Sequence, residues 1–309
     1  MQYRTLGKTG LEVSALSFGG AVMGGNFGAM DLAEATRAFH AALDHGVNYV
    51  DVAPYYGVTR AETMLGQVLK TVPRDKYIIS TKLGRYDVAS FDFSPARVVS
   101  SVDESLARLG LDYVDIMICH DIEFVEIEPV IEETLPAVDK LKQAGKLRYL
   151  GVSGLPLKIF EMVIPRFELD VVLSYCHYGL NDTSLTRLLP WIGKQKMGLI
   201  LGAPLAMGLL TPQGPLPWHP ADDELKQKCA EAALFCKSKG VDIAQLAVAF
   251  SLQEPRIHSV LCGMKSEAEV MTCLGSLDMQ IDPEVLAGVQ EILAPVKNRT
   301  WQSGLEENN

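Results

Sequence analysis

The chain has 309 residues, 48% of them hydrophobic and 21% charged, so it can bury a large core and does not resemble a disordered protein. Its formal net charge of −10 argues against nucleic acid or an anionic membrane as the main partner, because both attract clustered Lys and Arg. Six cysteines without a CxxC pair are too sparse for a disulfide scaffold, and no run approaches the roughly 18 apolar residues of a membrane span. We expect a cytoplasmic protein, monomeric or weakly homo-oligomeric.

One pattern repeats along most of the chain. Turn signals at Gly7 and Gly10 predict a β-hairpin between Tyr3 and Val13. After it, short apolar, β-branched runs alternate with helical stretches of ten or more residues. The predicted strands are 16–20, 48–52, 77–82, 114–120, 148–153, 171–175, 199–203 and 260–263. The predicted helices are about 32–45, 60–70, 95–109, 129–144, 156–164, 184–196, 224–239 and 266–275, with two further helices at 243–253 and 283–293.

Eight strand–helix units fit either a closed barrel or a doubly wound sheet. The strands read as continuous apolar runs, which is typical of parallel strands buried on both faces. A doubly wound dinucleotide domain should carry G-x-G-x-x-G after its first strand, whereas residues 19–25 read GGAVMGG. The pattern therefore predicts an α/β (β/α)₈ TIM barrel with an N-terminal β-hairpin and extra C-terminal helices, forming one domain over residues 1–309.

Polar side chains stand at the ends of four consecutive predicted strands. Asp51, Lys82, His120 and Ser153 each lie at or near a strand's carboxyl end. Barrel enzymes build their active sites at that end, so these side chains should share one mouth. Four such residues together favour an active site over four unrelated buried polar groups. No histidine pair has H-x-x-x-H or H-E-x-x-H spacing, so we expect no metal site.

The segment around Asp51 carries a recognisable motif. Residues 51–57 read Asp-Val-Ala-Pro-Tyr-Tyr-Gly, which places Tyr56 five residues after Asp51, and the strand-end Lys82 and His120 follow. Together with the stretches 6–14, 105–115 and 145–153, this pattern resembles the aldo-keto reductase superfamily over nearly the whole chain. The resemblance implies an NAD(P)-dependent oxidoreductase that moves a hydride between a carbonyl or alcohol carbon and a nicotinamide.

The chemistry of such a reaction assigns a role to each of four residues. A proton must move on the reacting oxygen while the hydride moves on carbon, and Tyr56 is the expected general acid/base. Because a tyrosine titrates near pH 10, we expect the Lys82 ammonium to lower the pKa of Tyr56. Asp51 would keep Lys82 charged and oriented, and His120 would bind the reacting oxygen.

The resemblance also implies a set of cofactor contacts. Ser153 matches the family serine that binds the nicotinamide carboxamide, although Gly154 stands where the family usually has Asn. The other matching positions are Ser174, Tyr175, Ala203, Pro204, Leu205, Gly208, Gly263, Met264, Lys265, Ser266 and Glu269. Glu269 stands where NADP-selective relatives place Arg, so its carboxylate favours NAD over NADP. Glu269 can equally be read as the third helical residue of a capping box that begins at Ser266.

Loop and tail segments narrow the expected substrate to a sugar. Residues 82–86, 120–124, 173–182, 204–211, 218–220 and 295–304 resemble a branch of the superfamily that oxidises L-galactose at its anomeric carbon. The resemblance implies NAD as oxidant and L-galactono-1,4-lactone as product, a step that would feed ascorbate synthesis or sugar catabolism. The candidate substrate-binding residues are Tyr56, His120, Asp121, Glu123, His177, Trp218 and Trp301.

Three other functions remain open at this point. The protein could act on another sugar or aldehyde, such as L-fucose or pyridoxal. It could be a Schiff-base lyase that uses Lys82 as nucleophile, although the Asp51–Tyr56 spacing has no special place in that chemistry. It could also be a cofactor-binding regulatory subunit without activity, which the intact Tyr56, Lys82 and His120 disfavour.

Overall fold

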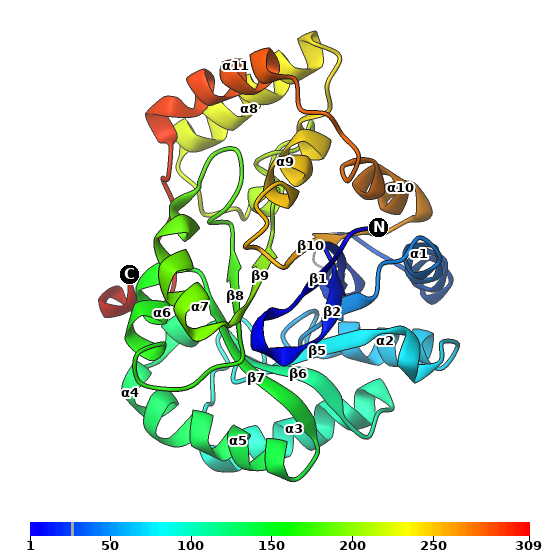
Figure 1. Cartoon of the computed structure of the whole chain (residues 1–309), viewed down its shortest axis with the longest axis vertical. Coiled ribbons are helices and arrows are strands. Elements are labelled where there is room, and N and C mark those ends of the chain that lie inside the picture. Colours follow the sequence, from blue (N-terminus) through cyan, green and yellow to red (C-terminus); the bar gives the residue numbers. More distant parts are fainter. Residues whose placement is uncertain (26–27) are drawn as a thin grey trace.

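The computed structural model describes residues 1–25 and 28–309. Within these ranges eight parallel strands close into a barrel in the order β10-β3-β4-β5-β6-β7-β8-β9, and helices surround it (Figure 1). The strands are β3 (Leu16–Gly19), β4 (Tyr49–Asp51), β5 (Ile78–Leu83), β6 (Val114–Cys119), β7 (Leu147–Gly154), β8 (Val171–Tyr175), β9 (Gly198–Gly202) and β10 (Ser259–Gly263). The predicted barrel is confirmed, and every predicted strand lies within one or two residues of an observed one.

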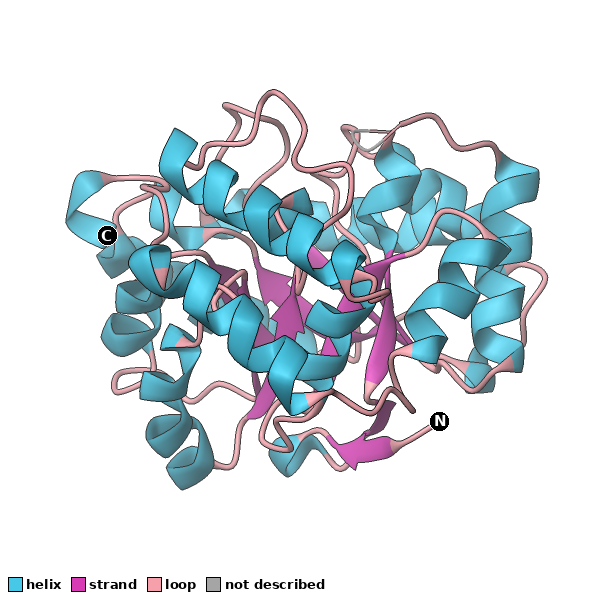
Figure 2. Cartoon of the chain, turned by 90° about the horizontal axis from the view of Figure 1, so that it is seen from above, coloured by secondary structure: helices cyan, strands magenta, loops and turns pink. Residues whose placement is uncertain are grey.

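A hairpin covers one end of the barrel. Strands β1 (Tyr3–Thr5) and β2 (Glu12–Ser14) pair antiparallel, as the turn signals predicted, and lie apart from the barrel strands in Figure 2. Leu6 and Val13 pack with barrel side chains such as Ile116 and Val171, which face the interior. The hairpin lies against the start of β9, because Lys8 N donates to Lys196 O. The carboxyl ends of the strands lie at the opposite mouth.

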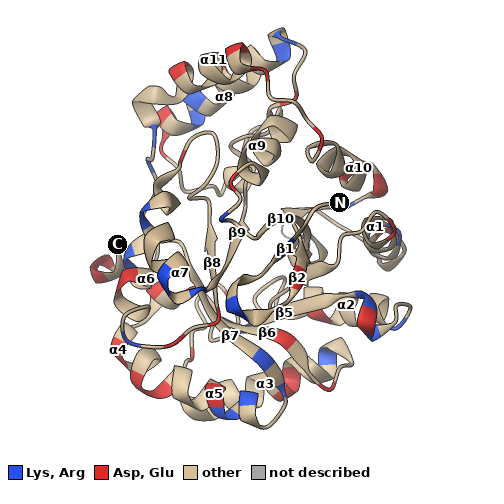
Figure 3. Ribbon diagram, in the orientation of Figure 1, with Lys and Arg blue, Asp and Glu red and all other residues tan. Residues whose placement is uncertain are grey.

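The helices largely match the predicted ranges. They are α1 (Leu32–Asp44), α2 (Arg60–Leu69), α3 (Pro95–Leu109), α4 (Ile127–Pro129), α5 (Leu135–Gln143), α6 (Leu157–Val163), α7 (Leu189–Gln195), α8 (Asp223–Ser238), α9 (Ile243–Leu252), α10 (Glu267–Gly275) and α11 (Pro283–Leu293). Lys and Arg are interspersed with Asp and Glu on outer helices such as α2, α3 and α5 (Figure 3). No described helix has the length and apolar character needed to cross a lipid bilayer.

Two predicted helices are not regular, and proline explains both. The range 129–144 contains a π-helical turn at Val130–Thr134 before α5, and the range 184–196 begins with a 3₁₀ turn at Ser184–Leu188 before α7. Pro136 and Pro190 lack the N–H that an α-helix needs at those positions, so the preceding turn takes another hydrogen-bonding pattern.

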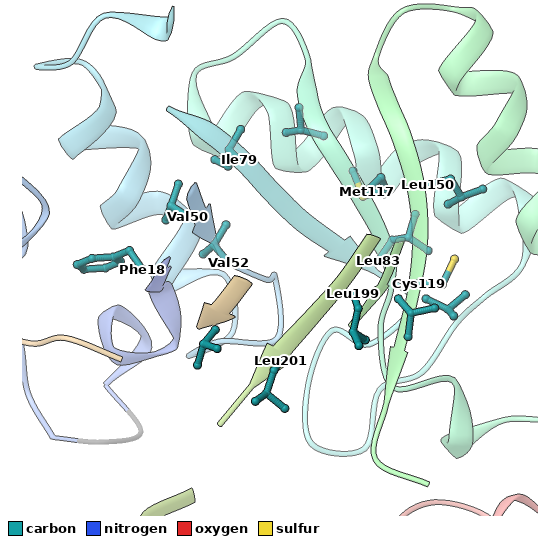
Figure 4. Packing of buried hydrophobic residues seen from close by; sticks show 14 of the residues in the cluster. Phe18, Val50, Val52, Ile79, Leu83, Met117, Cys119, Leu150, Leu199 and Leu201 are labelled. Atoms are coloured by element: carbon teal, nitrogen blue, oxygen red, sulfur yellow. The ribbon is translucent and has the colours of Figure 1, made fainter. Parts of the chain in front are cut away.

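The main hydrophobic core lies between the barrel strands and the surrounding helices. Its side chains alternate along the strands with those that face the interior, and Figure 4 shows Val50, Ile79, Leu150 and Leu199 among them. A second cluster joins α8 and α11, which lie side by side in Figure 1, and includes the buried thiols Cys229 and Cys236 on α8. All six cysteines are free thiols.

Shortening a side chain in the main hydrophobic core should destabilise the protein more than shortening one on the surface. Leu150 is 1% exposed and Leu234 on α8 is 68% exposed. We expect Leu150→Ala to lower the free energy of unfolding by about 2–5 kcal/mol, because it leaves a cavity among packed side chains. Leu234→Ala serves as the control and should change it by less than about 0.5 kcal/mol. Urea denaturation measures both, and equal effects would contradict this description of the core.

Candidate active site

The four residues to which the sequence analysis assigned chemical roles lie together at one mouth of the barrel. Asp51 is the last residue of β4, Lys82 lies near the end of β5, and His120 directly follows β6. Tyr56 comes from the turn between β4 and α2, and its ring meets that of His120 edge-on, with 5.7 Å between the centroids. Three adjacent strand ends and one loop therefore converge on a single position.

Lys82 is the centre of the hydrogen bonds in this group. Its ammonium donates to Asp51 Oδ1, to the Val52 carbonyl at 3.0 Å and to the Tyr56 hydroxyl at 3.0 Å. The Lys82 side chain is 1% exposed and that of Asp51 is 4% exposed. Ser80 Oγ donates to the other Asp51 oxygen at 2.6 Å, which holds the carboxylate in place. The buried cation is thus fully paired, as such a charge requires.

The surroundings change the pKa of Lys82, Tyr56 and His120. Burial alone would lower the pKa of Lys82, but Asp51 and Tyr56 outweigh it and raise the pKa above the usual lysine value. Burial raises the pKa of Tyr56 to about 12, although Lys82 opposes the rise. Burial lowers the pKa of His120 well below its usual value, and the Lys82 and Arg85 cations lower it further. Lys82 thus lowers the pKa of Tyr56 as expected, but desolvation of the phenolate raises it by more.

Two close glycine contacts fix the position of Tyr56. The 3₁₀ turn Gly20–Gly24 packs against the Tyr56–Gly57 peptide so tightly that a Cβ on Gly24 would lie 2.7 Å from the Tyr56 carbonyl carbon. Gly57 has a φ of +63°, and a Cβ there would lie 2.1 Å from Gly24 O. The glycines of the segment after β3 therefore allow the backbone to pack closely around Tyr56.

Two carboxyl groups, those of Asp121 and Glu123, follow His120 in the chain just after β6. Asp121 is 3% exposed, and its Oδ2 lies 3.5 Å from His120 Nε2. Burial raises the pKa of Asp121, while the nearby Arg85 opposes that rise. Burial and the neighbouring Asp121 raise the pKa of Glu123 to about 8. The structure thus keeps Glu123 neutral below about pH 8, next to an Asp121 that is paired with a cation.

Glu123 is hydrogen-bonded to residues 303–308, which we call the C-terminal segment. Its Oε1 accepts from Ser303 Oγ at 3.0 Å and from Leu155 N at 3.1 Å. Its backbone carbonyl accepts from Leu305 N at 2.8 Å and Asn308 Nδ2 at 2.9 Å. The sequence predicted Glu123 only as a substrate contact, and the structure adds that it anchors this segment.

The packing around Gly154 leaves no room for the Asn that the family resemblance led us to expect at this position. A Cβ on Gly154 would lie 2.5 Å from Glu123 Oε2 and 2.2 Å from Ile159 Cδ1. The Glu123 carboxyl and α6 therefore occupy the space that a side chain at position 154 would need. Glycine at this position and glutamate at position 123 belong to one packing arrangement.

The proposed nicotinamide contacts lie on neighbouring strand ends. The hydroxyl oxygen of Ser153, near the end of β7, accepts a hydrogen bond from Asp121 N at 3.4 Å. That bond does not use the hydroxyl hydrogen of Ser153. Ser174 is buried at the end of β8, where its hydroxyl has no partner in the described part of the chain. Tyr175 follows it, and its hydroxyl approaches Glu123 Oε1 at 3.5 Å.

The remaining cofactor positions follow β9 and β10. After β9, Ala203, Ala206 and Met207 all have positive φ, so the turn that contains Pro204, Leu205 and Gly208 is sharply bent. Gly263 ends β10, and Met264, Lys265 and Ser266 lead into α10. Ser266 accepts from Glu269 N at 3.2 Å, while Glu269 Oε2 accepts from Lys265 N at 2.8 Å. Ser266 thus caps α10, and the Glu269 side chain lies at the same helix start.

The other candidate substrate residues lie in two groups. His177 follows β8, where its Nδ1 contacts Asp182 at 3.2 Å and Ser184 at 2.9 Å, and its Nε2 is buried without a partner in the described residues. Trp218 and Trp301 both contact the His219 ring, with centroid distances of 6.2 and 4.8 Å. Trp301 also packs against the hydrophobic cluster that joins α8 and α11.

Comparison with known proteins identifies the family. Residues 15–294 match the family described as Aldo/keto reductase. The chain is 50% identical to L-galactose dehydrogenase of Arabidopsis thaliana, over 100% of this chain and 99% of that protein. It is 30% identical to D-arabinose 1-dehydrogenase of Saccharomyces cerevisiae, over 85% of each protein. The chain belongs to the aldo/keto reductase family.

A solved structure agrees with this assignment. The holo form of an aldo-keto reductase from Bacillus halodurans has a TM-score of 0.78 and 26% identity, and the match covers 100% of this chain and 99% of that one. The same barrel therefore extends over the whole of both chains.

The raised pKa of Glu123 gives stability a distinctive pH dependence. The folded chain holds this proton up to about pH 8, whereas the unfolded chain releases it near the ordinary value of 4.5. Between these values the folded state binds more protons, so this group makes stability fall as pH rises, by up to about 1.4 kcal/mol per pH unit. Glu123→Gln keeps an acceptor for Ser303 and should remove that slope.

The control for this experiment is Glu133→Gln, at an exposed position. Urea titrations between pH 5 and 8 should show the wild-type slope in this control. A Glu123→Gln variant with the wild-type slope would show that the carboxyl is ionised in the folded protein.

Proposed function

We propose that this protein oxidises L-galactose at the anomeric carbon, with NAD as hydride acceptor and L-galactono-1,4-lactone as product. The hydrogen-bonded series Asp51–Lys82–Tyr56 beside His120 carries the proposal, because it provides a proton-transfer group and an oxygen-binding group at one point. The full-length similarity to L-galactose dehydrogenase supports the sugar. The similarity to D-arabinose 1-dehydrogenase supports oxidation of an aldose at the same carbon.

The residues of the chain manage the proton and the reacting oxygen. Bound NAD supplies the acceptor for the hydride from the anomeric carbon. Tyr56 takes the hydroxyl proton, and Lys82 stabilises the phenolate form through its hydrogen bond. His120 stays neutral, so it donates one N–H to the oxygen without carrying a charge into the site. Asp51 fixes the Lys82 ammonium throughout the reaction.

The residues present fit a nicotinamide dinucleotide. Ser153, and Ser174 whose hydroxyl has no partner among residues 1–25 and 28–309, offer donors for the carboxamide. The bent turn after β9 would hold the pyrophosphate, and the start of α10 would meet the adenosine end. The Glu269 carboxylate at that helix start disfavours a 2′-phosphate, which supports NAD over NADP.

The geometry disfavours the Schiff-base alternative. A lysine nucleophile must lose its proton, whereas the pairing with Asp51 and Tyr56 raises the pKa of Lys82. The ammonium also donates to three acceptors, which leaves no N–H directed toward a substrate carbonyl. Lys82 is therefore a partner of Tyr56 and a poor nucleophile.

The proposed activity has a direct test. We expect NADH to appear rapidly with L-galactose, with a higher kcat/KM for NAD than for NADP because of Glu269. L-fucose, D-galactose and pyridoxal assayed in parallel define the substrate range, and identifying the product establishes whether the lactone forms. Measurable NAD binding without turnover of any sugar would reject the substrate while leaving the cofactor site in place.

Tyr56→Phe should separate proton transfer from binding. It removes the hydroxyl while keeping the ring against His120, so we expect kcat to fall by about 10²- to 10⁴-fold. NAD binding, followed by tryptophan fluorescence, should be unchanged. Tyr149→Phe is a matched control, because that hydroxyl donates to Thr9 O near the hairpin. Normal turnover in Tyr56→Phe would exclude Tyr56 as the acid/base.

A further inference from the structure

Arg85 lies just beyond β5, and aromatic rings surround its guanidinium. The guanidinium carbon is 3.8 Å from the centroid of the Tyr55 ring. It is 4.8 Å from the Phe124 centroid and 5.2 Å from that of Phe91. Phe91 and Phe124 are themselves stacked at 4.5 Å, with 10° between their planes. A cation held against these rings has little freedom to turn, so the direction of its N–H groups is fixed.

The guanidinium is aimed at Asp121. Arg85 Nη1 donates to Asp121 Oδ2 at 2.6 Å, and these side chains are only 11% and 5% exposed. The same Asp121 oxygen lies 3.5 Å from His120 Nε2. Asp121 also adopts a positive φ of 52°, in the left-handed region that aspartate tolerates better than most residues other than glycine.

Three side-chain atoms of this arrangement have no partner in the part of the chain that the structure describes, namely Asp121 Oδ1, Arg85 Nε and His120 Nδ1. Asp121 Oδ1 is buried and accepts no hydrogen bond there. A buried carboxylate oxygen without a donor costs free energy, so the site suits a ligand that brings a hydroxyl to it. Its neighbour His120 is the residue proposed to hold the reacting oxygen, so that hydroxyl would be on the next carbon of the sugar.

We propose that Arg85 is a positioning residue that orients Asp121 so that Oδ1 accepts a hydrogen bond from the sugar hydroxyl next to the anomeric carbon. This inference rests on the proposed function. It assigns Arg85 to substrate discrimination and separates it from the proton-transfer group, because its hydrogen bond goes to Asp121. The Tyr55 and Phe124 rings keep the guanidinium fixed, so Arg85 would act without moving during turnover.

The test compares kcat/KM for L-galactose and for 2-deoxy-L-galactose in the wild type, Arg85→Met, Asp121→Asn and the double variant. The wild type should prefer L-galactose by about 10- to 100-fold, as expected for one charged hydrogen bond. Arg85→Met and Asp121→Asn should each remove most of this preference, mainly through KM, and the double variant should be no worse than Asp121→Asn. L-fucose, which lacks a more distant hydroxyl, should show no such change.

Two variants keep the result interpretable. Arg97→Met removes a cation that stacks on Tyr86 at 4.0 Å and pairs with Glu104, and it should leave the preference unchanged. Arg85→Lys keeps the charge and should restore part of the preference; it also serves if Arg85→Met does not fold. An equal loss of kcat/KM on both sugars, or additive effects in the double variant, would reduce Arg85 to a structural role. A wild type without L-galactose oxidation would overturn the proposed function and this inference with it.

Discussion

The buried ion pair between Lys82 and Asp51 is the constraint on which the site depends. An isolated ammonium inside a barrel would cost several kcal/mol, so the fold must bring acceptors to it. Asp51 pairs in register with Ser80, and Lys82 lies two residues further along β5 on the same face of the strand. The register of β4 against β5 therefore sets the distance between the carboxylate and the ammonium. The Tyr56 hydroxyl completes the set of acceptors, so the residue proposed to move the proton also helps to keep the cation buried.

The same burial divides the site into charged and neutral groups. Lys82 and Arg85 are cations with nearby carboxylates, and both lower the pKa of His120, which stays neutral. Asp121 has Arg85 as its partner, whereas Glu123 has no cation within ion-pairing distance among the described residues and holds its proton to about pH 8. The two carboxyls therefore differ although they lie two residues apart. The Asp121 carboxylate, beside the reacting centre, can accept a hydrogen bond from a substrate hydroxyl. The neutral Glu123 carboxyl can support the C-terminal segment without adding charge.

The barrel and its mouth could be predicted from the sequence because both follow from short-range regularities. Apolar runs marked the strands, and strand-end positions marked Asp51, Lys82 and His120. The roles of individual residues depended on contacts that no spacing reveals. Arg85 meets Asp121 across two loops, although its place three residues after Lys82 was a signal that could have drawn attention to it. The lowering effect of Lys82 on the Tyr56 pKa could be predicted, but the larger opposite effect of burial could not, because the sequence does not show the degree of burial.

Position 154 shows how a departure from the family pattern can be read physically. Taken alone, a glycine in place of the usual Asn suggests a weakened carboxamide site. In the structure, the space beside Gly154 is filled by the Glu123 carboxyl and Ile159. Glu123 in turn accepts hydrogen bonds from Ser303 through its carboxyl group and from Leu305 through its backbone carbonyl. Restoring Asn at 154 would therefore displace Glu123 and loosen the C-terminal segment. The glycine, the neutral glutamate and the covering segment therefore form one packing unit beside Asp121, so a larger side chain at position 154 would disturb all three.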